Sequence, residues 1–243
     1  MLDPVAFPEC PGHPYNVKMK IEPDLYTVKI RRITIPQDDK TRSYHHGDLR
    51  RALLDAALEI VDAEGAGALS MRTIAREAGV SHMAPYHHFA DKAALIAAVA
   101  EEGFHALAQE MANRIAARGD DPKAALRESG IAYVVFAVTR PHLFRVMFGA
   151  EVAGMSDDYP GLNEAGQAAF AVLQGLVERS QEEGSVREAD SQGIGLTAWS
   201  LVHGLAMLII DGHFGPDAMQ PAGAERLAYE VTGGVYRGLR DSE

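Results

Sequence analysis

The segment LSMRTIAREAGVSHMAPYHHFADK, residues 69–92, constrains the local fold more than any other part of the chain. Ser70 can accept a free N–H of a first helical turn, so a short helix is expected from there to about Ala78. Gly79 follows where a helix end requires a left-handed residue, a conformation that glycine adopts without strain. Ser81 can cap a second helix. The pattern therefore predicts two short helices joined by a tight glycine turn.

The side chains expected on the second helix differ from those of a core helix. They are hydrogen-bonding or compact groups rather than leucines: His82, Met83, Ala84, Tyr86, His87 and His88. Phe89 can bury the end of this helix, and Asp91 can cap a further helix. A helix, a glycine turn and a second helix form the motif that places a recognition helix in the major groove of DNA. This general form is only moderately specific, because many core helix pairs also combine an alanine with a glycine.

A longer string of motifs narrows the interpretation. AREAGVS, Tyr-x-His-Phe and Asp-Lys-x-x-Leu occur in this order and resemble the DNA-binding domain of the TetR family of bacterial transcription regulators. The resemblance begins near Gly47 and is strong to about Leu107. Further along, FRVMFG from Phe144 and AWSLVHG from Ala198 resemble the TetR subgroup whose ligand domain is named for a Trp, a His and a Gly.

The resemblance implies an all-α fold of about nine helices. Residues 47–107 are expected to form a three-helix helix-turn-helix DNA-binding domain, with the motif at residues 70–89. Residues 108–243 are expected to form a helical domain for ligand binding and dimerisation. Helical spacing, caps, glycines and prolines predict further helices at these approximate positions: 91–118, 121–139, 141–148, 162–183, 189–211 and 222–240. No strand is expected after residue 40.

The resemblance assigns DNA contacts to nine positions: Arg72, Ser81, His82, Met83, Ala84, Tyr86, His87, His88 and Lys92. The segment from His82 to Ala84 would lie at the N-terminal end of the recognition helix, which meets base edges. Tyr86 and His88 align with positions that bind phosphate, and such contacts set the register of the helix without reading the base sequence. Lys92 lies in the first turn of the next helix, where free N–H groups and the helix dipole favour an anion such as phosphate. The alternative for Arg72 is a solvated surface arginine.

Pro85 departs from the family pattern, which has a branched apolar residue at this position. Proline removes an N–H and disfavours helical geometry at the preceding Ala84. If Ser81 or His82 is the N-cap, Pro85 falls in the first turn and at most one helical bond is lost. The motif is expected to survive, with Met83 and Ala84 at a slightly different angle to the bases.

The resemblance also places aromatic and methionine side chains around a small-molecule cavity in the C-terminal domain. These candidate ligand contacts are Phe104, Tyr133, Phe136, Phe144, Met147, Phe148, Trp199, His203 and Met207. The alternative is an ordinary core, since such residues at helical spacing usually pack in one. His203 lies one turn after Trp199 and could hydrogen-bond a ligand or a buried carbonyl. Ligand sites are mostly apolar with a few polar groups, which suits this set.

The charge distribution is compatible with DNA binding despite a net charge of −11. Residues 41–92 carry six basic and seven acidic side chains, whereas residues 93–243 carry eleven basic and twenty-one acidic ones. Most of the excess acid therefore lies outside the expected DNA-binding domain.

Metal, cofactor and catalytic chemistry find no support in the sequence. Cys10 is the only cysteine, which excludes an intrachain disulfide and a cysteine-rich zinc site. Adjacent histidines on a helix point about 100° apart, so the pairs His45-His46 and His87-His88 do not form joint ligand sets. Catalytic elbows, phosphate-binding glycine loops and dinucleotide fingerprints are all missing. We expect no metal, no cofactor and no enzymatic activity.

Residues 1–40 contain six of the twelve prolines and are expected to be a disordered extension. One alternative is a basic DNA-binding arm formed by Lys29, Arg31, Arg32, Lys40 and Arg42. Another is that translation starts at Met19 or elsewhere. We expect a cytoplasmic protein without a membrane partner. A signal pattern is missing, and the apolar run from Leu205 to Ile210 is too short to span a bilayer.

Together these features predict a ligand-responsive, DNA-binding transcriptional regulator that acts as a homodimer. The resemblance implies that the last two long helices of each subunit pair as a four-helix bundle. The expected activity is repression, relieved when a small, largely apolar effector releases the protein from a pseudo-palindromic operator. The alternative is a helical small-molecule-binding module or an enzyme whose helix-turn-helix has no DNA role.

Overall fold

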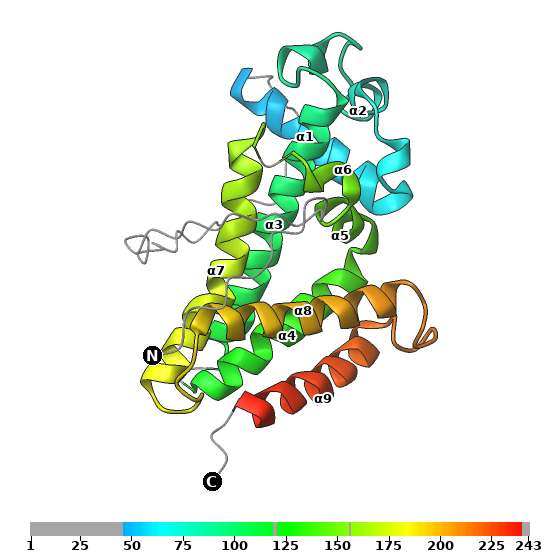
Figure 1. Cartoon of the computed structure of the whole chain (residues 1–243). Helices are drawn as coiled ribbons and strands as arrows, with labels where there is room; N and C mark the ends of the chain where they lie inside the picture. Colours follow the sequence, from blue (N-terminus) through cyan, green and yellow to red (C-terminus); the bar gives the residue numbers. More distant parts are fainter. Residues whose placement is uncertain (1–45, 119–120, 156, 240–243) are drawn as a thin grey trace.

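The computed structural model describes residues 46–118, 121–155 and 157–239, and this part of the chain is all-helical, without strands (Figure 1). Its α-helices are α1 (His46–Glu64), α2 (Met71–Glu77), α3 (Lys92–Ala116), α4 (Pro122–Thr139), α5 (Pro141–Met147), α6 (Ala150–Ala153), α7 (Pro160–Glu182), α8 (Ser191–Ile210) and α9 (Pro221–Leu239). Two 3-10 segments, η1 (Ala66–Ala68) and η2 (Ala84–His87), complete it. The all-α fold predicted from the sequence is confirmed. The expected extension over residues 1–40 lies outside the described residues.

The expected second helix of the motif is the main difference. Residues 84–87 form only a 3-10 turn, so the prediction of an α-helix after the glycine turn is wrong in type. Most of its backbone bonds join residues three apart: Tyr86 N–H donates to Met83 O at 3.2 Å, and His88 N–H donates to Pro85 O at 2.9 Å. One bond spans four residues, from Phe89 N–H to Pro85 O at 2.9 Å. Pro85 has no N–H to extend an α-helical ladder and disfavours the α-conformation of the residue before it.

Helix α3 runs from the end of the molecule that carries α1 and α2 into the body formed by α4, α7, α8 and α9 (Figure 1). It is 25 residues long, about 37 Å at the rise of an α-helix. Within the body it packs mainly against α7 and α4. One helix therefore connects both ends of the molecule.

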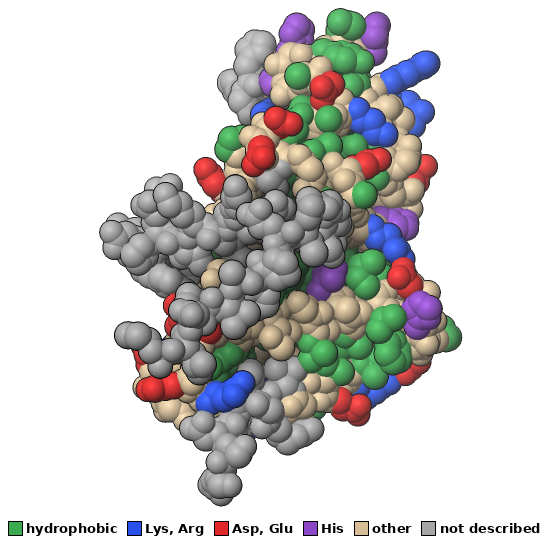
Figure 2. All heavy atoms as spheres, in the orientation of Figure 1, with side chains coloured by type: hydrophobic (Ala, Val, Ile, Leu, Met, Phe, Trp, Pro, Cys, Tyr) green, Lys and Arg blue, Asp and Glu red, His purple; other side chains and the backbone are tan. Residues whose placement is uncertain are grey.

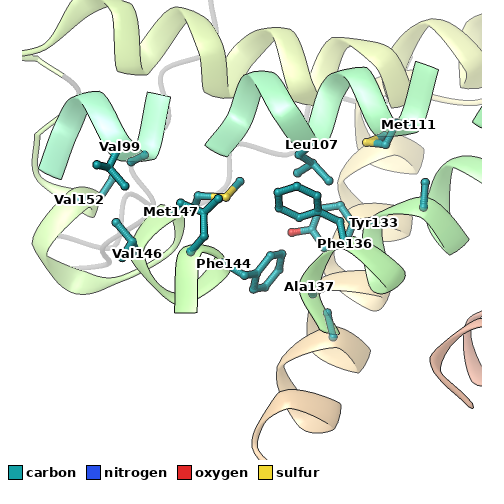
Figure 3. Close-up of a cluster of buried hydrophobic side chains, with 14 of the residues drawn as sticks. Val99, Leu107, Met111, Tyr133, Phe136, Ala137, Phe144, Val146, Met147 and Val152 are labelled. Atoms are coloured by element: carbon teal, nitrogen blue, oxygen red, sulfur yellow. The ribbon is translucent and has the colours of Figure 1, made fainter. Parts of the chain in front are cut away.

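The hydrophobic core is continuous along α3. Leu53, Ile74 and Phe89 belong to the same buried cluster as the first turns of α3, while Leu107 and Met111 continue the core where α3 packs against α4 and α7. Figure 3 shows side chains from α3, α4 and α5 meeting in this cluster, with Phe144 among them. Phe144 is completely buried. Movement of α3 would thus be felt at both ends, because a close-packed interior transmits displacement.

By length and composition α8, with 20 residues, is apolar enough to cross a membrane. The run from Leu205 to Ile210 is too short to span a bilayer by itself, but the whole helix Ser191–Ile210 is long enough. In the structure α8 packs against α4, α7 and α9. Some of its apolar side chains are buried by this packing, whereas others, including Leu196, Leu201 and Leu208, are exposed.

Candidate DNA interface and ligand cavity

Helix α2 is held at its start by a reciprocal cap. The Thr73 N–H donates to Ser70 Oγ at 3.1 Å, and the Ser70 N–H donates to Thr73 Oγ1 at 2.8 Å. Two N–H groups that a helix start leaves unpaired are thereby satisfied. Ile74 and Ala75 face the core and are almost completely buried. The outer face of α2, which includes Arg72, remains exposed.

The turn after α2 has the expected backbone geometry. Gly79 adopts a φ of 68°, and the Val80 N–H donates to Ala75 O at 2.9 Å. Phe89 is only 3% exposed and anchors the segment that follows η2. Asp91 then caps α3, accepting the Ala94 N–H at 2.8 Å. These local anchors hold residues 81–88 across the end of the molecule although no α-helix forms there.

Most predicted DNA contacts lie on this surface. Met83 and Tyr86 are 54% and 52% exposed, and the following are also exposed: Arg72, Ser81, His82, His87 and Lys92. Ala84 and His88 are partly buried. Figure 2 shows histidine and basic side chains around the end of the molecule that carries α2. Arg50 is not among the predicted DNA contacts. Its guanidinium lies 5.5 Å from the centre of the Phe89 ring and so joins α1 to this surface.

The body of the molecule contains a cavity of about 190 Å³. Its lining comes from α3 to α9 and includes five of the nine predicted ligand contacts: Phe104, Tyr133, Met147, Phe148 and Trp199. The other four do not line it. Phe136 and Phe144 are buried core residues, whereas His203 and Met207 are partly buried.

His203 does not line the cavity but contacts Tyr133, which does. Its Nδ1 lies 2.8 Å from the Tyr133 hydroxyl, and Trp199 Nε1 donates to the same hydroxyl at 3.2 Å. Burial lowers the pKa of His203 below its ordinary value of 6.5. With the imidazole neutral, the Tyr133 hydroxyl can donate to Nδ1. His203 therefore has a partner that the sequence analysis did not foresee, neither a ligand nor a carbonyl.

Several cavity residues were missed because they belong to helices without a recognised motif. Phe170, Asn163 and Gln167 come from α7, and Arg127 comes from α4. Helical spacing alone does not tell which face of α7 meets α3. Among the described residues, no three histidine, cysteine or acidic side chains come together to hold a metal ion.

Two family models match the chain, one over the helix-turn segment and the start of α3, the other over the helical body that follows. Residues 53–99 match "Bacterial regulatory proteins, tetR family", and residues 126–231 match "Tetracyclin repressor-like, C-terminal domain". The chain belongs to the TetR family. These models describe regulators, which agrees with the prediction that this family member is not an enzyme.

Relatives of this TetR family chain agree with that assignment. The HTH-type transcriptional regulator BetI of Pseudomonas aeruginosa is 43% identical over 79 residues, which cover 32% of this chain and 40% of BetI. A protein of unknown function from Rhodococcus sp. RHA1 is 31% identical, with a TM-score of 0.69 over 83% of this chain and 100% of its own. FadR from Bacillus subtilis, solved with stearoyl-CoA, shares the fold at 16% identity, with a TM-score of 0.64 over 78% of this chain and 99% of its own.

In this TetR family protein, α5 connects the cavity to α1. Its last residue, Met147, lines the cavity. At the other end of α5, the Arg140 guanidinium binds both carboxylate oxygens of Asp62 on α1, with Nε at 3.2 and 3.1 Å, and His142 Nδ1 lies 3.2 Å from the Asp62 carbonyl oxygen. Gly103 of α3 lies so close to Met147 that a Cβ there would be 2.7 Å from its side chain. Because these contacts are direct, a displacement of Met147 at the cavity can be transmitted to α1 and to α3.

Proposed function

We propose that this chain is a homodimeric transcriptional regulator that binds operator DNA and changes its affinity when a small molecule occupies the cavity. The observation that carries the proposal is the connection of an exposed, anchored helix-turn segment to an apolar cavity through α3. Phe104 and Leu107 of this helix line the cavity, while Lys92 begins it. The match to the transcriptional regulator BetI, which covers 40% of that relative, supports this role.

DNA binding is supported by the chemistry of the exposed segment. Lys92 stands at the first position of α3, where unpaired N–H groups and the helix dipole favour a phosphate. Tyr86 is an exposed residue of the preceding segment and offers a hydroxyl, and Arg72 and His82 are also exposed. Met83 offers an apolar contact of the kind that a thymine methyl accepts. The 3-10 geometry around Pro85 would present these groups differently from an α-helix.

Dimerisation is supported by an exposed apolar face on α8 and α9. Leu196, Leu201 and Leu208 follow one side of α8, and Tyr229 is exposed on α9. Gly204, on α8, has nothing within 4 Å of a Cβ position, so a partner helix could approach closely there. A two-fold interface through these helices would present two recognition segments to successive major grooves, about 34 to 36 Å apart.

We propose repression with ligand-induced release as the mode of action. A ligand changes affinity only if it binds one arrangement of α3 and α5 better than another. The Trp-His-Gly subgroup and a cytoplasmic location remain predictions that fit this role. The B. subtilis FadR structure holds stearoyl-CoA, so a related helical arrangement can accommodate a small-molecule ligand.

Fluorescence anisotropy with labelled DNA from upstream of the gene tests DNA binding. Lys92→Ala and Tyr86→Phe should each weaken binding, because each removes a phosphate contact. Lys92→Ala should also flatten the dependence of log K on log salt by about 1.8, since each of the two protomers contributes about 0.9. Arg187→Ala is the matched control, because this exposed cation lies between α7 and α8, away from the motif.

Binding that is insensitive to Lys92→Ala and to salt would remove the DNA-binding role. In that case the remaining function would be that of a ligand-binding module. Turnover of a substrate by the purified protein would favour the enzymatic alternative instead.

A further inference from the structure

We propose that the natural effector is an apolar molecule with one negatively charged group, and that Arg127 binds this group. The inference deepens the proposed function, because it names the ligand class of the same cavity. Arg127 is the one cavity-lining side chain among the described residues that is charged at neutral pH. The remaining lining is aromatic, aliphatic or uncharged polar.

Arg127 is partly buried, and its buried Nε lacks a hydrogen-bond partner. No carboxylate of the described residues lies within ion-pair distance of Arg127. The guanidinium carbon lies 4.5 Å from the centre of the Tyr229 ring on α9, which orients the group without satisfying its donors. An unsatisfied buried donor of a charged group costs free energy, and an anionic ligand would recover it.

The neighbouring carboxylate, Glu128, is not the ion-pair partner of Arg127. Glu128, the next residue, is only 6% exposed and already binds Arg114 Nε at 2.6 Å and Arg118 Nη2 at 2.7 Å. Arg114 also binds Glu225 of α9. Of these three arginines, only Arg127 lines the cavity, and only Arg127 has no ion-pair partner among the described residues.

The other polar groups of the lining are mostly satisfied within their own helices. Ser129 Oγ donates to Leu126 O at 2.8 Å, and Thr232 Oγ1 donates to Ala228 O at 2.7 Å. Gln167 Nε2 donates to Asn163 Oδ1 at 3.1 Å. A bound ligand would therefore be surrounded mainly by apolar side chains, with the Arg127 guanidinium as the one cationic hydrogen-bond donor among the described residues. Arginine suits carboxylate and phosphate alike, because its planar fork can bind two oxygens at once.

The cavity volume limits the size of this ligand. At about 190 Å³ it somewhat exceeds the engineered cavity of about 150 Å³ that binds benzene. A single ring or a chain of about eight carbons matches that space. Phe104, Phe148, Phe170 and Trp199 would contact the apolar part.

Trp199 is the only tryptophan and lines the cavity, so its fluorescence reports occupancy directly. We would titrate the full-length protein, without DNA, with octanoate, octyl phosphate, 1-octanol and octylammonium. At least one anion should bind about tenfold or more tightly than 1-octanol, because a hydrogen bond to a charged group contributes about 1.5–3 kcal/mol. Octylammonium should bind more weakly than 1-octanol. The preferred anion distinguishes a carboxylate from a phosphate effector.

Arg127→Met keeps the length of the side chain and removes the charge, so it should abolish the anion preference while 1-octanol binding stays within about twofold. Arg127→Gln is a second variant that retains a polar end. Arg187→Met is the control, because Arg187 is exposed between α7 and α8 and does not line the cavity. Circular dichroism checks that each variant is folded.

The proposal is overturned if Arg127→Met or Arg127→Gln, when folded, keeps the preference for the anion. It is also overturned if the parent protein binds 1-octanol as tightly as both anions, or binds none of the four probes. These readouts do not involve DNA. Anion binding that leaves operator affinity unchanged would therefore contradict the proposed regulation and leave the ligand class intact.

Discussion

Gly130→Ala tests whether helix propensity or packing dominates where α4 meets α8 and α9. A Cβ on Gly130 would lie 2.7 Å from Thr232 Cγ2 and 3.2 Å from Val202 Cγ1. Both neighbours are buried and β-branched, so neither can rotate away at low cost. Alanine gains about 0.8–1.0 kcal/mol of helix propensity over glycine, whereas overpacking costs about 1–3 kcal/mol. We expect the free energy of unfolding to fall by up to about 2 kcal/mol.

Gly166→Ala is the matched control, since Gly166 also lines the cavity from within a helix. Its Cβ would lie 3.9 Å from Phe104 Cε2, an ordinary van der Waals contact. The propensity gain is the same, so this variant should be stabilised by about 0.8–1.0 kcal/mol. Urea unfolding at one protein concentration, followed by far-UV circular dichroism, measures both. Equal stabilisation of the two variants would refute the reasoning, because α4 would then be free to move away from α9.

Three further predictions concern the dimer, the connection between cavity and α1, and pH. Leu201→Glu puts a charge on the exposed apolar face of α8, so light scattering should find a monomer; a dimeric variant would place the interface elsewhere. Arg140→Ala breaks a partly exposed ion pair with Asp62, which should cost less than about 1 kcal/mol of stability. It should nevertheless weaken ligand-induced operator release several-fold in the anisotropy assay, and unchanged release would exclude this contact from the coupling. Because burial lowers the pKa of His203, the unfolded chain binds the proton first as the pH falls below 6.5, and the free energy of unfolding declines until the lower folded-state pKa is reached. His203→Asn should show a shallower decline of the urea midpoint over this window, and identical pH profiles would contradict the assignment.

Features that depend on neighbours in the sequence were predicted well. Ser70 and Asp91 cap helices as expected, and Gly79 takes the left-handed conformation. Asp121 followed by Pro122 begins α4, as predicted from an N-cap followed by a proline. Each of these signals acts within one turn of the backbone, so the local sequence is sufficient to determine the outcome.

The helix after Gly79 was predicted less well although Pro85 was recognised as unusual. The expected loss of one bond became the loss of the α-helix, because most backbone bonds around residues 84–87 join residues three apart. The described part still contains nine α-helices, since the short α6, which no pattern predicted, takes the place of the recognition helix in that count. How Met83 and Ala84 would meet base edges is thus decided by the backbone around Pro85.

The sequence by itself determined that this chain is helical, that it carries the TetR motif, and where most helices begin and end. Caps, glycines and prolines act locally, so they need no knowledge of distant residues. The tertiary structure alone decided which aromatic side chains line the cavity, that Tyr133 joins His203 to Trp199, and that Arg127 lines the same apolar cavity. These properties arise where α3, α4, α7, α8 and α9 pack, and burial and hydrogen-bond partners there depend on residues far apart in the chain.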